Sequence, residues 1–114
     1  MKSGIDPIVY PTRDIAQAKA LYAKVLGVEP YADTPYYVGF RIGDQEIGLD
    51  PNGHDKGMSG PIAYVHVDDI EARLQELLDA GATAQQPVND VGEGKLIASV
   101  KDADGNDIGL VQEP

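Results

Sequence analysis

The feature that most constrains this chain is an internal repeat spanning most of its 114 residues. A shift of 54 positions aligns six identical residues in the two halves: Pro7 with Pro61, Ile8 with Ile62, Tyr10 with Tyr64, Asp14 with Asp68, Ala18 with Ala72, and Gly27 with Gly81. Near the end of each half, Ile47-Gly48-Leu49 matches Ile108-Gly109-Leu110 at a shift of 61. The repeat predicts two copies of one structural unit within a single domain of this length.

Each half begins with a strand. The alternation of residues 5–12 predicts a strand that places Ile8 and Tyr10 on one face. Pro7 and Pro11 fall on the opposite face, and proline cannot donate to a sheet ladder. These prolines therefore indicate either an edge strand or a strand with relaxed pairing.

A helix is predicted next. Asp14 can cap its first turn, with Gln17 as the capping-box partner, and Gly27 can end it in a left-handed conformation. The residues that share its apolar face at helical spacing are Ile15, Ala18, Leu21, Tyr22, Val25 and Leu26.

Two short strands, Tyr36–Ile42 and Glu46–Asp50, complete the first module at about residues 4–50, with a turn at Gly43-Asp44. The composition of residues 51–60 (PNGHDKGMSG) predicts a mobile linker. The second module then covers about residues 61–114.

The second module repeats the order. A strand at Ile62–Val67 precedes a helix that Asp68 is expected to cap, with Glu71 as its partner, and that Gly81 is expected to end. The buried stripe of this helix is predicted to be Ile70, Leu74, Leu77 and Leu78. Strands are then expected at about Ala82–Pro87, Lys95–Lys101 and Asp107–Gln112, with a turn at Asp104-Gly105.

Composition excludes several classes of protein. The chain has no cysteine, which excludes disulfide scaffolds, thiolate metal sites and cysteine nucleophiles. It has 9 Lys and Arg against 19 Asp and Glu, a net charge of −10, which argues against nucleic acid or an anionic membrane as partner and suits a cationic ligand. With neither a signal peptide nor an apolar stretch of membrane-spanning length, a soluble cytoplasmic protein is expected.

The repeat and two motifs resemble the vicinal oxygen chelate superfamily, which includes glyoxalase I, extradiol dioxygenases, fosfomycin-resistance enzymes and bleomycin-resistance proteins. Asp14-Ile15 leading to Leu21-Tyr22-Ala23-Lys24-Val25-Leu26-Gly27 resembles the family's "D-(aliphatic)…FY…vLG" helix. Lys101-Asp102-Ala103-Asp104-Gly105-Asn106 resembles its "(K/R)DPDGN" turn. The resemblance implies an α+β fold of two tandem βαβββ modules, with curved mixed sheets, helices outside and a cavity inside.

Catalytic members of that superfamily hold a divalent metal in the cavity, with ligands from the first and last strands of each module. Carried onto this chain, those positions fall on Pro7, Gly48, Ile62 (Pro61 if the register slips by one residue) and Gly109. None of these side chains offers a donor, whereas such a cation needs imidazole or carboxylate groups. The chain is therefore expected to hold no metal and no other cofactor, and metal-dependent glyoxalase or dioxygenase activity is not expected.

One histidine is a candidate catalytic residue. His66 shares the strand parity of Ile62 and Tyr64, so all three are predicted to face the cavity. A histidine there could act as a general acid or base. It could equally be a strand-end residue that is half in solvent or hydrogen-bonded to a neighbour.

Charged residues flank the cavity position of Gly48. Glu46 and Asp50 share its parity and lie about 13 Å apart along the strand, which is too far for a glycosidase pair. One of them could bind a cation at the rim, or both could form a solvated edge. Arg41 could bind an anionic ligand group or pair with either carboxylate across the hairpin.

Aromatic residues supply candidate walls for the cavity. Tyr36, Tyr37 and Tyr64 are candidates for stacking against a ligand. Tyr10 and Tyr22 are assigned instead to the core between helix and sheet.

The resulting hypothesis is a metal-free small-molecule binding protein similar to the antibiotic-sequestering members, with a cationic or aromatic ligand held at the interface of a homodimer. Met58 of the linker could close over the cavity or be an exposed loop residue. The expected ligand-binding residues are Tyr37, Arg41, Glu46, Gly48, Asp50, Met58, Ile62, Tyr64, His66, Gly109 and Val111.

Two alternatives remain open. The first is a metal-independent lyase or isomerase in which His66 acts as the base and Tyr64 or Arg41 polarises a carbonyl. The second is a non-catalytic subunit with a degenerate site, which a cavity filled by Ile62, Val9 and Val111 would favour.

Overall fold

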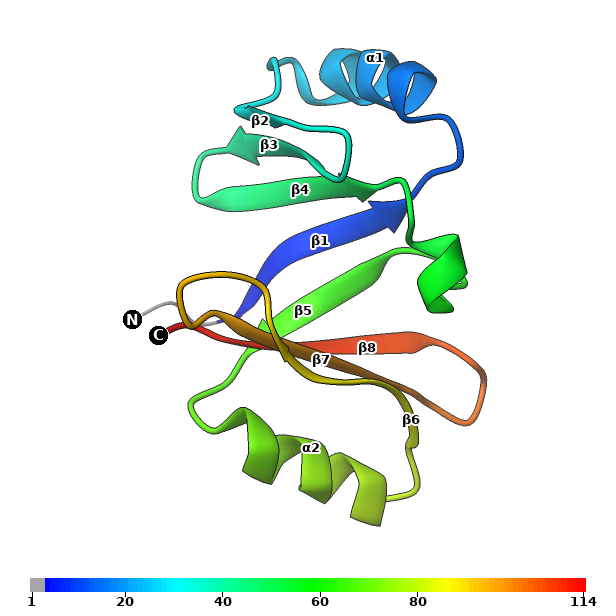
Figure 1. Cartoon of the computed structure of the whole chain (residues 1–114), viewed down its shortest axis with the longest axis vertical. Coiled ribbons are helices and arrows are strands. Elements are labelled where there is room, and N and C mark those ends of the chain that lie inside the picture. Colours follow the sequence, from blue (N-terminus) through cyan, green and yellow to red (C-terminus); the bar gives the residue numbers. More distant parts are fainter. Residues whose placement is uncertain (1–3) are drawn as a thin grey trace.

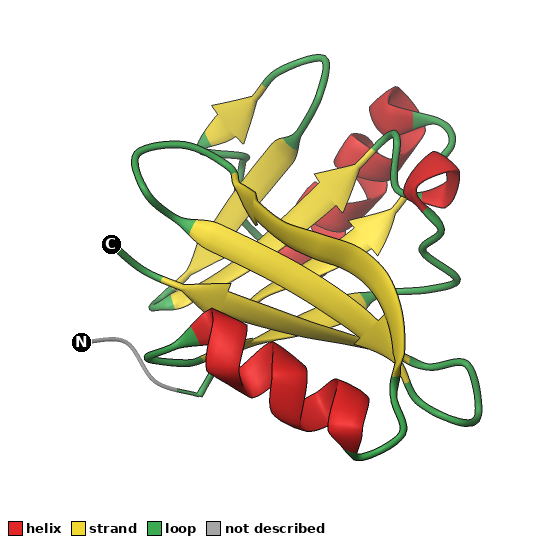
Figure 2. Ribbon diagram, turned by 60° about the horizontal axis from the view of Figure 1, so that its bottom comes forward, coloured by secondary structure: helices red, strands yellow, loops and turns green. Residues whose placement is uncertain are grey.

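The computed structural model describes residues 4–114 and shows a mixed α+β fold built on one continuous eight-stranded sheet (Figure 1). The sheet curves, and the two longer helices lie outside it, one against each half (Figure 2). In chain order the elements are β1 (Ile5–Pro11), α1 (Ile15–Leu26), β2 (Ala32–Asp33), β3 (Val38–Ile42), β4 (Gln45–Asp50), the short 3-10 helix η1 (His54–Lys56), β5 (Ile62–His66), α2 (Ile70–Asp79), β6 (Thr83–Asp90), β7 (Leu96–Lys101) and β8 (Asp107–Gln112).

The strand order β2-β3-β4-β1-β5-β8-β7-β6 contains two equivalent halves joined edge to edge. In each half the first strand pairs in parallel with the last, β1 with β4 and β5 with β8. The halves meet where β1 and β5 pair antiparallel. The two modules therefore share one sheet rather than forming separate sheets.

The register between the halves corrects the shift inferred from sequence identities. Val9 lies opposite Gly48, and Tyr64 lies opposite Gly109, so Val9 and Tyr64 are equivalent positions at a shift of 55. The shift of 54 instead aligns Tyr64 with Tyr10, which packs against the first helix. A slip of one residue along a strand reverses the face on which a side chain lies.

Strand β1 is central, so its prolines do not mark a sheet edge. Its pairing with β5 is interrupted between Ile5 and Ile8, the interval that contains Pro7. The alternative of relaxed pairing is therefore correct, and the interruption places proline where no ladder hydrogen bond is required.

Helix α1 begins and ends as its sequence predicts, but its buried face is narrower. Asp14 caps it by accepting a hydrogen bond from the Gln17 N–H, and Gly27 ends it with a φ of 73°. Leu21 and Val25, expected in the core, are 58% and 67% exposed. The sheet covers only part of the apolar face of α1, so these two side chains stay exposed.

Helix α2 begins one residue later than predicted. Its N-cap is Asp69, whose side chain accepts from the Ala72 N–H, so Asp68 and its expected partner Glu71 do not form the cap. The N–H of Ile70 donates to the Gln112 side chain, and the Ile70 side chain is buried. These two anchors set the start of the helix.

Several strand bounds also differ. The short edge strand β2 was not located from sequence, β3 starts at Val38 rather than Tyr36, and β6 continues to Asp90. Irregular pairing of β6 with β7 explains why simple alternation failed for β6.

Two apolar clusters lie between the helices and the sheet. One centres on Phe40 and Leu49 beneath α1, and the rings of Tyr10 and Tyr22 meet there at 5.1 Å between centroids, as expected. The other centres on Ile70 and Leu110 beneath α2. Within residues 4–114, no helix has the length and apolar character needed to cross a membrane.

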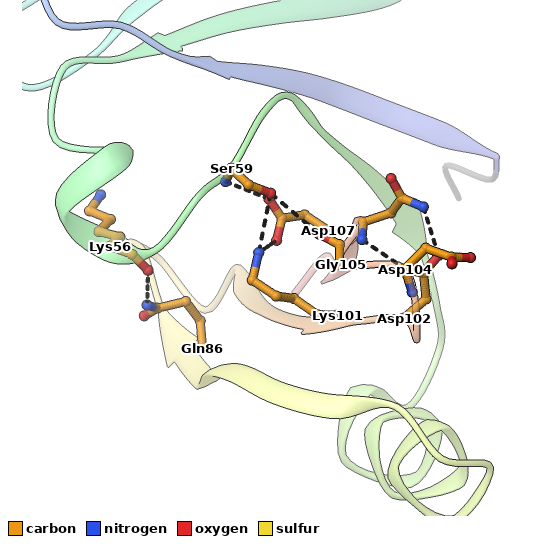
Figure 3. A network of polar contacts seen from close by, with 9 residues as sticks. Lys56, Ser59, Gln86, Lys101, Asp102, Asp104, Gly105 and Asp107 are labelled. Carbon is orange, nitrogen blue, oxygen red and sulfur yellow. Dashed lines mark hydrogen bonds and ion pairs between the residues drawn. The ribbon is translucent and has the colours of Figure 1, made fainter.

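The linker of residues 51–60 is packed against the sheet, so the prediction of a mobile segment is wrong. Its Met58 is buried, and the Ser59 N–H donates to Asp107 of β8 at 3.0 Å (Figure 3). Asp107 also pairs with Lys101 of β7, and the carbonyl of Lys56 accepts from the Gln86 side chain at 2.7 Å. Composition could not reveal these long-range partners.

Candidate functional site

The concave side of the sheet holds a cavity of about 440 Å³. It lies between the two modules and is lined by residues of both. The lining residues are Pro7, Val9, Tyr36, Tyr37, Glu46, Asp50, Lys56, Tyr64, Val91, Lys95 and Ile97. Four of the expected ligand-binding residues are among them: Tyr37, Glu46, Asp50 and Tyr64.

Two glycines make room for two tyrosine rings on this face. A Cβ at Gly48 would lie 2.6 Å from the ring of Tyr37, closer than carbon atoms pack. A Cβ at Gly109 would lie 2.6 Å from the ring of Tyr64. The two glycines are equivalent in the repeat, but Tyr64 comes from the strand beside Gly109, whereas Tyr37 precedes β3.

In the first module, a cluster of polar side chains holds Tyr37 in place. The Tyr37 hydroxyl donates to one Glu46 oxygen at 2.5 Å, and Arg41 pairs with the other at 3.3 Å. Arg41 also stacks 4.4 Å from the centre of the Tyr31 ring, and the Glu46 N–H donates to the buried carboxylate of Asp6. Burial, and then the hydrogen bond to Glu46, raise the pKa of Tyr37 well above its usual range. Of the alternatives for Arg41, the structure shows the pair with Glu46.

A second cluster lies where β4 ends. Lys56 pairs with one oxygen of Asp50 at 2.8 Å, and the other oxygen accepts from the Asn52 N–H at 2.8 Å. Burial, followed by the negative charges of Asp50 and Asp107, raises the pKa of Tyr64 to about 12. The Tyr64 hydroxyl therefore keeps its proton at neutral pH.

Several expected ligand-binding residues form the packed floor instead. Val9, Met58 and Ile62 make one buried cluster against which Tyr64 packs, and Val111 is fully buried. Met58 thus fills space beneath the cavity, and it is neither a cover nor an exposed residue. The floor is filled, as the degenerate-site alternative required, but a cavity remains above it.

His66 does not line this cavity. Its side chain is buried, Nδ1 lies 3.9 Å from a Glu113 oxygen, and Nε2 has no partner among residues 4–114. Lys95, which does line the cavity, approaches the same Glu113 oxygen at 3.9 Å. The acid–base role of His66 stays a prediction.

Sequence reasoning missed four lining residues: Lys56, Val91, Lys95 and Ile97. Ile97 lies opposite Val111 of β8, an expected ligand-binding residue, so pairing of the two predicted strands could have indicated its face. Lys56 belongs to the segment wrongly expected to be mobile. Val91 and Lys95 belong to the β6–β7 loop, where no alternation indicates which way a side chain points.

The residues at the four family metal positions do not fit a metal ion. Pro7, Gly48, Ile62 and Gly109 carry no donor atoms, and tyrosine rings cover both glycines. Among the described residues 4–114, no three His, Asp or Glu side chains are grouped so as to hold an ion.

Solved structures share this fold at low sequence identity. A glyoxalase/bleomycin resistance protein/dioxygenase superfamily member from Vibrio splendidus 12B01 superposes with a TM-score of 0.75 at 17% identity, covering 98% of this chain and 100% of that one. Methylmalonyl-CoA epimerase from Mycobacterium tuberculosis gives 0.68 at 16% identity, covering 97% and 88%. The Mn(II)-bound glyoxalase from Novosphingobium aromaticivorans gives 0.70 at 17% identity, covering 96% of this chain and 38% of that one.

No curated protein matches the sequence significantly. A family model does match, and it covers residues 4–110. With both the repeat and the continuous sheet in agreement, this chain belongs to the Glyoxalase/Bleomycin resistance protein/Dioxygenase superfamily.

Proposed function

We propose that this protein binds a small organic molecule in the concave cavity without the help of a metal ion. The observation that carries the proposal is the cavity of about 440 Å³ between the two modules. Cavities of roughly 300–1,000 Å³ with mainly apolar walls and a few placed polar groups are typical small-molecule sites.

The walls suit an aromatic or otherwise flat ligand. Tyr37 and Tyr64 present rings from the two modules, while Val9 and Ile97 add aliphatic surface. Aromatic side chains offer large apolar contact area together with one polar group each. Binding alone would lower the free concentration of a harmful compound by mass action. This is the function of a protein similar to the antibiotic-sequestering members of the superfamily.

The open cavity supports binding over the degenerate-site alternative. The acid–base alternative has less support, because His66 lies outside the lining residues. The homodimer expected from the family resemblance stays a prediction.

The proposal is tested by filling the cavity. Ile97→Trp places a large ring at a half-buried lining position, and Leu21→Trp adds the same ring to an exposed position on α1 as the matched control. Compounds from a library of small aromatic molecules should raise the melting temperature of the wild type and of Leu21→Trp, but not of Ile97→Trp. Equal shifts in all three proteins, or none in any, would overturn the proposal.

A further inference from the structure

We propose that the cavity selects molecules that present an acceptor oxygen, a carbonyl or a carboxylate, on a flat apolar body. This inference rests on the proposed binding function and names its ligand class. It follows from which polar atoms of the cavity already have partners and which do not.

The acceptors of the cavity are already engaged. Both oxygens of Glu46 have donors, one from Tyr37 and one from Arg41. Both oxygens of Asp50 have donors as well, from Lys56 and from the Asn52 N–H. A ligand ammonium would therefore have to break an existing pair to reach either carboxylate, and losing a buried partner costs more than a new bond returns.

The donors of the cavity have spare capacity. The Tyr64 hydroxyl has no hydrogen-bond partner among residues 4–114, and Lys56 lines the same cavity as Tyr64. Lys56 uses one of its three N–H groups on Asp50. Lys95 approaches Glu113 only at 3.9 Å, beyond hydrogen-bond distance, so among residues 4–114 its ammonium makes this loose ion pair and no hydrogen bond.

The local charge does not follow the net charge of −10. Each cavity carboxylate has a basic partner, Arg41 for Glu46 and Lys56 for Asp50. Nearby Asp107 is likewise paired with Lys101. A cationic ligand, which the overall composition seemed to suit, would meet Lys56 and Lys95 rather than free carboxylates.

The shape of the site favours a ligand with a flat apolar body. The ring of Tyr64 lies against Gly109, and Tyr64 packs on the buried cluster of Val9, Met58 and Ile62, so its free hydroxyl borders an apolar floor. A molecule of two fused rings with one oxygen substituent can contact the rings while its oxygen accepts from Tyr64 and Lys56. Because Asp50 and Asp107 are each paired with a lysine, the donors can serve either an uncharged carbonyl or a carboxylate.

Three probes of one shape test the inference by calorimetric titration at pH 7. They are 2-acetylnaphthalene, 2-naphthoate and 2-naphthylmethylammonium, which carry a carbonyl, a carboxylate and a cation on the same rings. We expect at least one of the two oxygen acceptors to bind about 10-fold more tightly than the ammonium.

Variants connect that preference to the assigned donor. Tyr64→Phe removes only the hydroxyl and should weaken binding of the acceptor probes about 3- to 10-fold, the range for one net hydrogen bond. Tyr22→Phe, on the opposite face of the sheet, is the matched control and should leave affinity unchanged. Lys56→Met should weaken the naphthoate more than the ketone, because only the naphthoate carries a charge.

The outcomes separate this inference from the proposed function. If the ammonium probe binds most tightly, and Ile97→Trp abolishes its binding, the cavity binds small molecules but the acceptor class is wrong. Acceptor binding that is unchanged in Tyr64→Phe also overturns the inference. Failure of all three probes to bind overturns both.

Discussion

At the residue scale, the concave face depends on two glycines that each lie beneath a tyrosine ring. Gly48 and Gly109 occupy equivalent positions on the last strands of the two modules. Any side chain there would meet Tyr37 or Tyr64. The absence of a Cβ is therefore what allows the rings to lie against the sheet and shape the cavity.

Gly48→Ala should lower the free energy of unfolding by about 1–3 kcal/mol, the usual cost of overpacking. The Tyr37 ring cannot move away easily, because its hydroxyl is bonded to Glu46. Gly60→Ala is the matched control, since nothing lies within 4 Å of its added Cβ, and it should be nearly neutral. Urea unfolding of both variants checks this, and equal stability would show that Tyr37 does not lie over Gly48.

Stability should also depend on alkaline pH through Tyr64. Its pKa rises from 10.0 in the unfolded chain to about 12 in the fold, so the fold favours the protonated hydroxyl. This contribution is fully present below pH 10 and is lost as the pH rises from 10 towards 12, by at most about 1.4 kcal/mol per pH unit. Urea unfolding at pH 9, 10 and 11 should show a steeper decline for the wild type than for Tyr64→Phe. If the free energy of unfolding declined equally with pH in the two proteins, the Tyr64 hydroxyl would not be buried.

The residues that sequence reasoning placed correctly are those fixed by strand parity. Glu46 and Tyr64 line the cavity because alternate residues of a strand share a face. Met58 and Ile62 share the concave side but are buried in its floor. Strand parity predicts on which face of the sheet a side chain lies, but it does not predict how deeply that side chain is buried.

At the scale of elements, the packed linker determines one end of the cavity. Lys56 reaches the cavity from η1, and the neighbouring Ser59 is bonded to Asp107 of β8 (Figure 3). Asp107 is buried and also pairs with Lys101. A loop that composition predicts to be mobile is thus held by a buried carboxylate 48 residues further along the chain.

Asp107→Ala should destabilise the protein by about 2–4 kcal/mol, because it leaves Lys101 and the Ser59 N–H without their shared acceptor. Asp33→Ala removes a surface pair with Lys19, in which both side chains are 39–50% exposed, and should cost less than about 1 kcal/mol. Chemical denaturation compares the two variants. Similar small losses would mean that the linker is not held by Asp107.

Most element types follow from sequence, and the errors arise where contacts distant in sequence decide the structure. The caps of α1 are correct because Asp14 and Gly27 act through their nearest neighbours. The start of α2 was wrong by one residue because a contact with distant Gln112 anchors Ile70. Pro7 left open an edge strand or relaxed pairing, and only the partner strands decide for relaxed pairing in the centre of the sheet.

At the scale of the whole molecule, one chain supplies both walls of the cavity because β1 and β5 join the modules in one curved sheet (Figure 1). The fold is that of its superfamily, but tyrosine rings now cover the glycines at two of the family metal positions. The fold could be recognised from the repeat and its motifs. The ligand class could not, because it depends on which polar groups already bond to one another.

Equilibration with Ni²⁺, Zn²⁺ or Mn²⁺ followed by gel filtration and elemental analysis should leave far less than one ion per chain. Pro7, Gly48, Ile62 and Gly109 offer no imidazole or carboxylate to any of these ions. Melting temperatures with and without each ion should agree. One bound ion per chain, with a raised melting temperature, would restore a metal-dependent function.

The most direct test of the account is a methyl NMR titration with the two oxygen-bearing naphthalene probes. Val9, Val91 and Ile97 line the cavity, whereas Ile8 and Ile47 lie on the helix side of the same sheet. We predict saturable shifts of the three cavity methyl groups, with the two helix-side residues nearly unchanged. If the helix-side methyl groups shift instead, or none responds at millimolar probe, the concave cavity is not the binding site.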